Sequence, residues 1–88
     1  MLELVRKSQF KRDFKKLRSS GKDLSKLAEI IERLQNEHPL PPSARDHGLI
    51  GDYRGYRECH ISPDWLLIYK VQSNQLILVR TGSHGELF

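Results

Sequence analysis

The fold is decided by two apolar segments joined by a short polar turn, WLLIYKV (residues 65–71), QSN (72–74) and LILV (76–79). The first segment is almost continuously apolar, which is typical of a central strand covered on both of its faces. The turn residues predict that the second segment folds back beside the first. The sequence therefore predicts a hairpin of two long strands within a sheet.

A third strand is predicted immediately before this hairpin. RGYRECHI (54–61) alternates in polarity, so Glu58 and His60 share one side of a strand while Cys59 points to the other. Ser-Pro-Asp (62–64) is typical of a turn. The three strands together predict an antiparallel meander.

The beginning of the chain predicts a short strand and an amphipathic helix. The strand covers residues 2–5 and ends by Lys7. Ser8 is a favoured cap for a helix over residues 9–19, and Gly21 is suited to end that helix. The apolar side chains of this helix recur at helical spacing, at Phe10, Phe14 and Leu17.

A second helix is predicted over residues 24–34, where Asp23 can cap its start and five apolar side chains form a stripe. The prolines within residues 39–42 end this helix and require an extended segment. The predicted order is β-α-α-β-β-β. The fold class is therefore α+β, a single domain over residues 1–88 with an antiparallel sheet and a helical hairpin packed on one face.

Composition limits the class of protein. Hydrophobic residues make up 38% and charged residues 30% of the 88 residues, which suits a globular domain. No apolar stretch is long enough to span a membrane, and the start of the chain lacks a signal-peptide pattern. Cys59 is the only cysteine, so we expect a reducing cytoplasmic location and no internal disulfide.

Positive charge is concentrated near the beginning of the chain, although the net charge is only +4. Between Arg6 and Arg18 the only acid is Asp13. Such a stripe attracts polyanions, because binding releases their counterions. A solvated helix face is the simpler interpretation, and charge alone does not distinguish RNA, DNA, acidic lipid or an acidic protein.

Histidines lie mostly in the second half, at His47, His60 and His84. Cleavage of RNA without a metal needs a base for the ribose 2′-OH, an acid for the departing 5′-oxygen and a cation near phosphorus. Histidine suits the first two tasks and arginine the third. The chain offers these groups beside the acids Glu58 and Asp64, so a metal-independent nuclease site is a hypothesis of the sequence.

Simpler interpretations stay open for each of these residues. His60 fits a strand histidine bonded to a neighbour, Asp64 fits ordinary turn chemistry, and His84 fits an exposed tail. Cys59 is expected to be a core thiol, because its side chain and that of His60 point to opposite faces. No closely spaced His/Cys pairing predicts a zinc site, so neither a metal nor a cofactor is expected.

Two segments, DHGLIGDYRGYRECHISPDWLLIYK (46–70) and RTGSHGELF (80–88), resemble the YafQ-type toxins of the RelE/ParE superfamily. The resemblance extends over nearly the whole chain, and the predicted element order fits that superfamily. It implies the toxin of a bacterial type II toxin-antitoxin system, which enters the ribosomal A site and cuts mRNA without a metal. The implied partners are a cognate antitoxin, the ribosome and mRNA.

The same resemblance implies roles for particular residues. His84 would be the general acid, while His60 and Asp64 would share base work and orientation. His47 would position the substrate and Arg80 would stabilise the phosphate. A further group is implied as supporting residues: Phe88, which either stacks on a base or packs the tail, Glu58, where relatives can carry an aspartate, and Arg57.

The basic residues near the beginning of the chain would dock against ribosomal RNA or an acidic antitoxin segment: Lys7, Lys11, Arg12, Lys15, Lys16 and Arg18. Two rival functions remain at this stage. One is a non-cleaving toxin on the same fold, such as a ParE-like gyrase inhibitor, and the other is a simple RNA-binding module.

Overall fold

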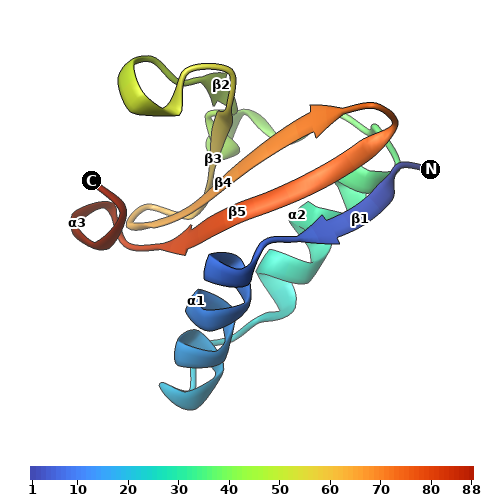
Figure 1. The fold of residues 1–88 in the computed structure, drawn as a ribbon. Helices are drawn as coiled ribbons and strands as arrows, with labels where there is room; N and C mark the ends of the chain where they lie inside the picture. Colours follow the sequence, from blue (N-terminus) through green and yellow to red (C-terminus); the bar gives the residue numbers. More distant parts are fainter.

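A five-stranded sheet forms the centre of the computed structural model, which describes residues 1–88 (Figure 1). Across the sheet the strands follow the order β1 (Glu3–Arg6), β5 (Gln75–Gly82), β4 (Trp65–Gln72), β3 (Arg57–Ser62) and β2 (His47–Gly48). β4 occupies the middle position, as its continuous apolar sequence predicted. The α+β fold class is confirmed.

The prediction of a wholly antiparallel sheet was wrong at one edge. β1 pairs with β5 in parallel, with Leu4 opposite Leu76, while every other pair is antiparallel. A parallel pair needs a long connection between its strands, and here nearly the whole chain separates them. The two-residue strand β2 was also not predicted, because His47 and Gly48 are too short a segment to show alternation.

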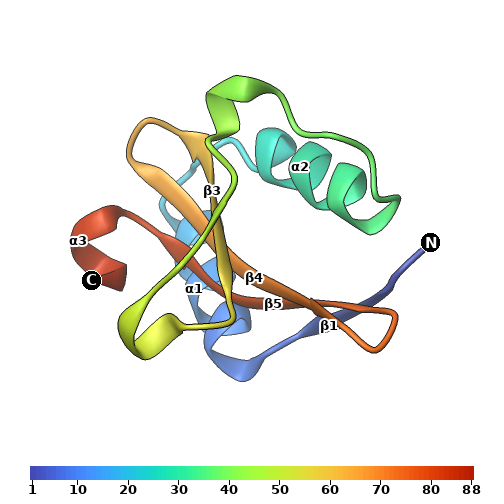
Figure 2. The ribbon, with the colours of Figure 1, turned by 90° about the horizontal axis from the view of Figure 1, so that it is seen from above.

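Both long helices, α1 (Ser8–Ser19) and α2 (Ser25–Gln35), pack against one face of the sheet. In Figure 1 both helices extend below β4 and β5, and in Figure 2, seen from above, α1 lies beneath these strands. Phe10 of α1 and Leu27 of α2 enter a core that includes Leu67 and Leu78. The predicted helical hairpin is confirmed.

The helix ends differ in detail from the predictions. Ser8 lies in the first turn of α1, and Lys7 occupies the cap position without a side-chain bond. Asp23 does bind the start of α2, because its carboxylate accepts hydrogen bonds from the backbone and hydroxyl of Ser25. α2 ends at Gln35, before the prolines, and the chain turns through Glu37 in a left-handed conformation.

The opposite face of the sheet is covered by short elements only. The 3-10 helix η2 (Gly51–Tyr53) and the short helix α3 (His84–Leu87) lie over it. Leu66 and Ile68 of β4 pack there with Leu87. β4 is therefore buried on both faces, and its polar neighbour Thr81 is satisfied by Trp65 and a backbone carbonyl.

A further 3-10 helix, η1 (Pro42–Ala44), lies between α2 and the sheet and contacts β3. No helix of the structure has the length and apolarity that a bilayer crossing requires; the longest has 12 residues.

The double burial of β4 generates a stability prediction. We expect Leu67→Ala to lower the free energy of unfolding by about 2–5 kcal/mol, because it removes a fully buried side chain and leaves a cavity. Urea denaturation of the two proteins measures this difference. Ile50→Ala is the control, because Ile50 is 90% exposed; its effect is expected within about 0.5 kcal/mol. Equal stability of all three proteins would contradict the proposed packing.

Candidate active site

His84 lies on α3, the four-residue helix that follows β5. Ser83 and Glu86 form a reciprocal capping box, in which each side chain accepts a hydrogen bond from the other residue's backbone N–H. Leu87 is buried and attaches the helix to the sheet face. The sequence predicted an exposed tail here rather than a helix. The Ser-x-x-Glu spacing was the signal that could have revealed the helix.

Three segments meet around α3. The carboxylate of Asp64, in the β3–β4 turn, accepts a hydrogen bond from the His84 backbone N–H at 3.3 Å. The His84 ring lies 5.0 Å from the Phe88 ring, and Phe88 contacts Tyr53 edge-on at 5.6 Å. Asp64 and His84 therefore lie side by side, although Asp64 contacts the His84 backbone rather than its ring.

Two tyrosines, Tyr53 at the end of η2 and Tyr56 just after it, extend this surface. Tyr53 packs edge-on against Tyr56, and the Lys70 ammonium lies 5.1 Å from the centre of the Tyr56 ring. Neither tyrosine was predicted as a site residue. The alternation of tyrosine with arginine in DYRGYR (52–57) is the signal that could have drawn attention to them.

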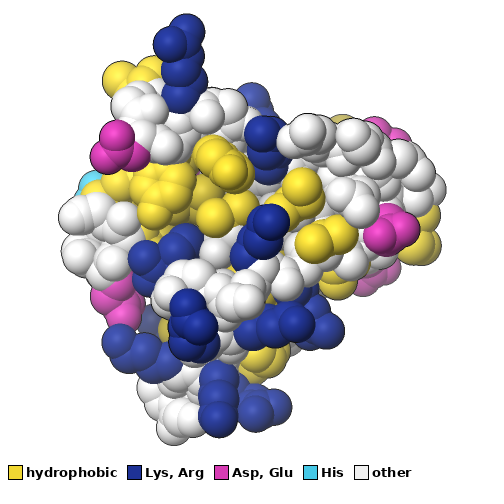
Figure 3. Space-filling view, in the orientation of Figure 1, with side chains coloured by type: hydrophobic (Ala, Val, Ile, Leu, Met, Phe, Trp, Pro, Cys, Tyr) yellow, Lys and Arg dark blue, Asp and Glu magenta, His cyan; other side chains and the backbone are white.

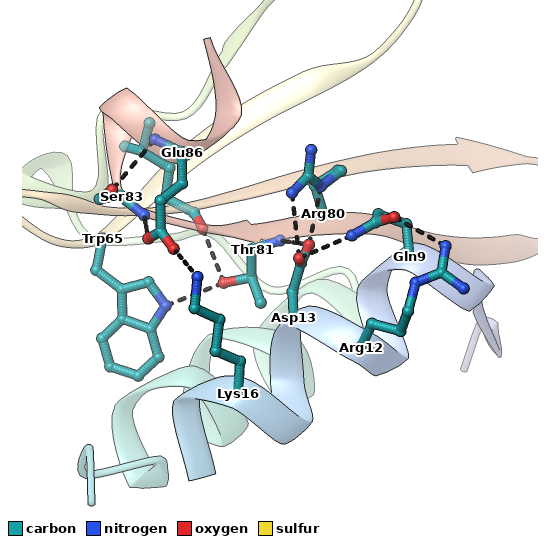
Figure 4. A network of polar contacts seen from close by, with 10 residues as sticks. Gln9, Arg12, Asp13, Lys16, Trp65, Arg80, Thr81, Ser83 and Glu86 are labelled. Carbon is teal, nitrogen blue, oxygen red and sulfur yellow. Dashed lines mark hydrogen bonds and ion pairs between the residues drawn. The ribbon is translucent and has the colours of Figure 1, made fainter. Parts of the chain in front are cut away.

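Arg80, on β5, forms a bidentate ion pair with Asp13 of α1 (Figure 4). The two N–O distances are 2.9 and 3.1 Å, and Asp13 also accepts a hydrogen bond from the Thr81 backbone N–H. Hydrogen bonding to Asp13 raises the pKa of Arg80. The ion pair fixes the guanidinium and connects α1 to the strand that leads into α3.

A second connection between α1 and α3 lies beside the first. Lys16 donates a hydrogen bond to Glu86 at 3.0 Å (Figure 4). Hydrogen bonds from the Ser83 backbone and from Lys16 lower the pKa of Glu86 to about 2. Lys16, predicted only as part of a basic surface, therefore also holds the helix that carries His84.

A buried carboxylate organises the other histidines. Glu58 has only 6% of its side chain exposed, and its Oε1 lies 3.6 Å from His60 Nε2 and 3.8 Å from His47 Nε2. His47 Nδ1 donates a hydrogen bond to the Arg45 carbonyl, because a carbonyl only accepts. His47 therefore presents Nε2 to Glu58.

Strand register places Arg80 and the Glu58–His60 pair on one face of the sheet. Ile68 pairs with Glu58 on one side and with Arg80 on the other, and Leu66 likewise pairs with His60 and Gly82. The Glu58 and Arg80 backbones are thus two strand spacings apart, about 10 Å. α3 packs over the same face through Leu87. The structure therefore collects the predicted residues His47, His60, Asp64, His84, Arg80, Phe88 and Glu58 on one face.

Arg57 is not part of this group. Its guanidinium binds Asp46 at 3.2 Å, and Asp46 also accepts a hydrogen bond from Tyr69, which belongs to the core under the helices. Hydrogen bonding to Tyr69 and Asp46 raises the pKa of Arg57. Because Asp46 directly precedes His47, this cluster fixes the backbone of His47 from the other side of the sheet.

Cys59 is a core thiol, as predicted. It is fully buried among the residues under the helices, and burial raises its pKa to about 12. No group of three or more His, Cys, Asp and Glu side chains is arranged to hold a metal ion. The expectation of a reaction without a metal stays a prediction.

The predicted basic surface lies on α1 and on Lys7 directly before it, and Lys and Arg side chains gather over the lower part of the molecule (Figure 3). The six residues are all exposed: Lys7, Lys11, Arg12, Lys15, Lys16 and Arg18. Arg12 donates to Gln9, which in turn donates to Asp13, so the basic surface is joined by hydrogen bonds to the Arg80 ion pair.

The contacts of Glu86 generate a pH prediction. Its pKa is lowered in the folded state, so its charge stabilises the fold above the unfolded value of 4.5 and this stabilisation is lost as the pH falls toward about 2. We expect Glu86→Gln to be less stable than the parent near neutral pH. The difference should shrink between pH 5 and pH 2, roughly.

Urea denaturation at several pH values measures this difference. Glu32→Gln is the control for the loss of one negative charge, because the Glu32 side chain is exposed and makes no hydrogen bond. A Glu86→Gln deficit that is independent of pH would show that charge is not the cause.

Comparison with known proteins gives consistent matches over the whole chain. The family model described as a bacterial toxin of type II toxin-antitoxin system, YafQ, matches residues 2–88. The mRNA interferase toxin YafQ of Escherichia coli K12 is 42% identical over 81 residues, which cover 91% of this chain and 88% of that protein.

Solved structures of similar proteins have the same fold. A copper-bound mutant toxin from Helicobacter pylori is 49% identical with a TM-score of 0.95, and the match covers 100% of both chains. The Escherichia coli DinJ-YafQ toxin-antitoxin complex contains a chain that is 39% identical with a TM-score of 0.90, covering 99% of this chain and 97% of that one.

Proposed function

This chain belongs to the YafQ family of bacterial type II toxins, as its sequence predicted, and we propose that it is a ribosome-dependent endoribonuclease that cleaves mRNA in the A site. The observation that supports this most is the common face shared by His84, Arg80 and the Glu58–His60 pair. The name mRNA interferase, which its relative from Escherichia coli carries, agrees with this activity.

The proposed reaction is general acid–base catalysis without a metal. The ribose 2′-oxygen attacks phosphorus and the bond from phosphorus to the 5′-oxygen breaks, leaving a cyclic phosphate and a 5′-hydroxyl. His60, assisted by the buried carboxylate of Glu58, takes the 2′-OH proton. His84 gives a proton to the departing 5′-oxygen, and Arg80 stabilises the charge on the phosphate.

The remaining predicted residues support these groups. Asp64 orients α3 through the His84 backbone, which gives it a positioning role rather than base work. His47 shares Glu58 with His60 and positions the substrate. Phe88 is 54% exposed while its ring contacts His84, so it can stack on a base beside the scissile phosphate.

A cognate antitoxin is the proposed protein partner. The Escherichia coli complex of DinJ with YafQ supports such a partner for this chain. The basic surface of α1 would receive an acidic antitoxin segment in the inactive complex and ribosomal RNA during cleavage. Lys16 and Arg12 connect this surface to the candidate active site. A partner bound to α1 would therefore lie beside the site.

The catalytic proposal is tested at His84. We expect His84→Ala to slow cleavage of mRNA on purified ribosomes by about 10²–10⁴-fold, because it removes the general acid. Primer extension measures the cut sites and their rate. His38→Ala is the matched control, because His38 is exposed at the end of α2 and far from α3 in the chain.

Unfolding by urea checks that both variants fold. Cleavage by His84→Ala at the rate of the His38→Ala control would exclude His84 from catalysis. The rival functions give other outcomes in cells that express the parent chain: DNA damage without mRNA cuts indicates a gyrase inhibitor, and neither effect indicates an RNA-binding module.

The docking proposal is tested on α1. Four of its basic residues make no side-chain hydrogen bond or ion pair, so their reversal to Glu spares the fold: Lys7, Lys11, Lys15 and Arg18. We expect the variant to bind ribosomes more weakly and with less salt dependence, the log–log slope falling by about 3. Cosedimentation across a salt series measures this. An unchanged slope in a folded variant would mean that α1 does not face the RNA.

A further inference from the structure

The surface is hollowed beside His60, at the free edge of β3. β2 pairs only with Arg57 and Glu58, so the end of β3 has no neighbouring strand there. The hollow, of about 410 Å³, lies between the start of α2, η1 and the β3–β4 turn. Its polar lining consists of Lys26, Ser43, Arg45, His60 and Ser62.

Neither cation of this hollow has an ion-pair partner, although hydrogen bonds from Ser25 and, to a smaller extent, the charge of Lys26 lower the pKa of the nearby Asp23. No carboxylate lines it, and the side chains of Lys26 and Arg45 make no hydrogen bond or ion pair. A smaller hollow continues from it along α2, and the acid there, Glu29, is paired with Arg33 at 3.7 Å. A hollow with two free cations and two hydroxyls fits a phosphate group.

Arg45 is also held in an unfavourable backbone conformation. Its φ of 48° and ψ of 44° lie in the left-handed region, which side chains other than those of Asn and Asp rarely adopt. The conformation is fixed on both sides, because Ala44 is buried and Asp46 is bound by Arg57 and Tyr69. Such strain concentrates at functional sites.

We propose that this hollow binds the phosphate of the RNA strand that lies on the 5′ side of the scissile phosphate, an inference that rests on the proposed endoribonuclease function. His60 belongs to both places: it lines the hollow, and its Nε2 faces Glu58 on the catalytic face. The nucleotide whose 2′-OH His60 deprotonates precedes the scissile phosphate. The next phosphate upstream therefore lies beyond His60, where Lys26 and Arg45 line the hollow.

The test removes charge from the hollow of the toxin and, separately, from the upstream phosphate of the RNA. The hollow variant carries Lys26→Gln and Arg45→Asn, where asparagine tolerates the left-handed backbone. The matched control carries Lys22→Gln and Arg54→Asn, which removes the same charge outside the hollow. The RNA is an mRNA on ribosomes with or without an uncharged methylphosphonate at the upstream position.

We expect the hollow variant to need about tenfold more toxin for half-maximal cleavage, the effect of one lost charge-assisted contact, with little change in the maximal rate. The methylphosphonate should have the same effect on the parent and no further effect on the hollow variant. The assignment would be overturned if the methylphosphonate weakened cleavage by the hollow variant as much as cleavage by the parent. It would also be overturned if the hollow variant needed no more toxin than the control variant for half-maximal cleavage. If the double variant does not fold, Lys26→Gln with Lys22→Gln gives the same comparison.

Binding is measured separately, so that the two proposals can fail independently. A short oligoribonucleotide with 2′-O-methyl groups is not cleaved, and we expect it to shift the amide NMR signals of Ser43 and Ile61 in the parent but not in the hollow variant. Shifts without any cleavage of natural mRNA by the parent would reject the nuclease function alone. Cleavage without these shifts would reject the hollow alone.

Discussion

The structure depends on the burial of β4 from both sides. Leu67 and Tyr69 face the two long helices, while Leu66 and Ile68 face the opposite cover. In a chain of 88 residues only short elements remain to form that second cover. The candidate catalytic residues lie in or beside this cover, so the same contacts that bury one face of β4 also hold the site.

Because the second cover of β4 consists of short elements only, its position depends strongly on polar contacts. α3 has a single buried side chain, Leu87, and its position depends further on Asp64, the Ser83 capping box and Lys16. The Lys16–Glu86 contact is exposed and weak by itself. The partly buried Asp13–Arg80 pair is bidentate and gives a more rigid connection between α1 and the site.

The sequence predicted the elements that have a clear period. The continuous apolar run of β4 and the helical stripes of α1 and α2 gave the correct class and the correct faces. The parallel direction of β1 was not predicted, because nothing in a four-residue strand indicates which strand it pairs with or in which direction. β2 was not predicted because it has only two residues, and α3 was not predicted because its capping box was overlooked and the segment was expected to be an exposed tail.

The site was predictable in its residue types but not in its pairings. The alternation in β3 correctly put Glu58 and His60 on one face, whereas Arg57 lies on the other with Asp46. Asp13 is separated from Arg80 by 67 positions, so no local pattern connects them. Yet this acid decides how Arg80 can act: the ion pair offsets part of its charge but fixes its orientation. A cation that is already oriented loses little side-chain entropy when a phosphate arrives, and this advantage grows as the negative charge on phosphorus increases during the reaction.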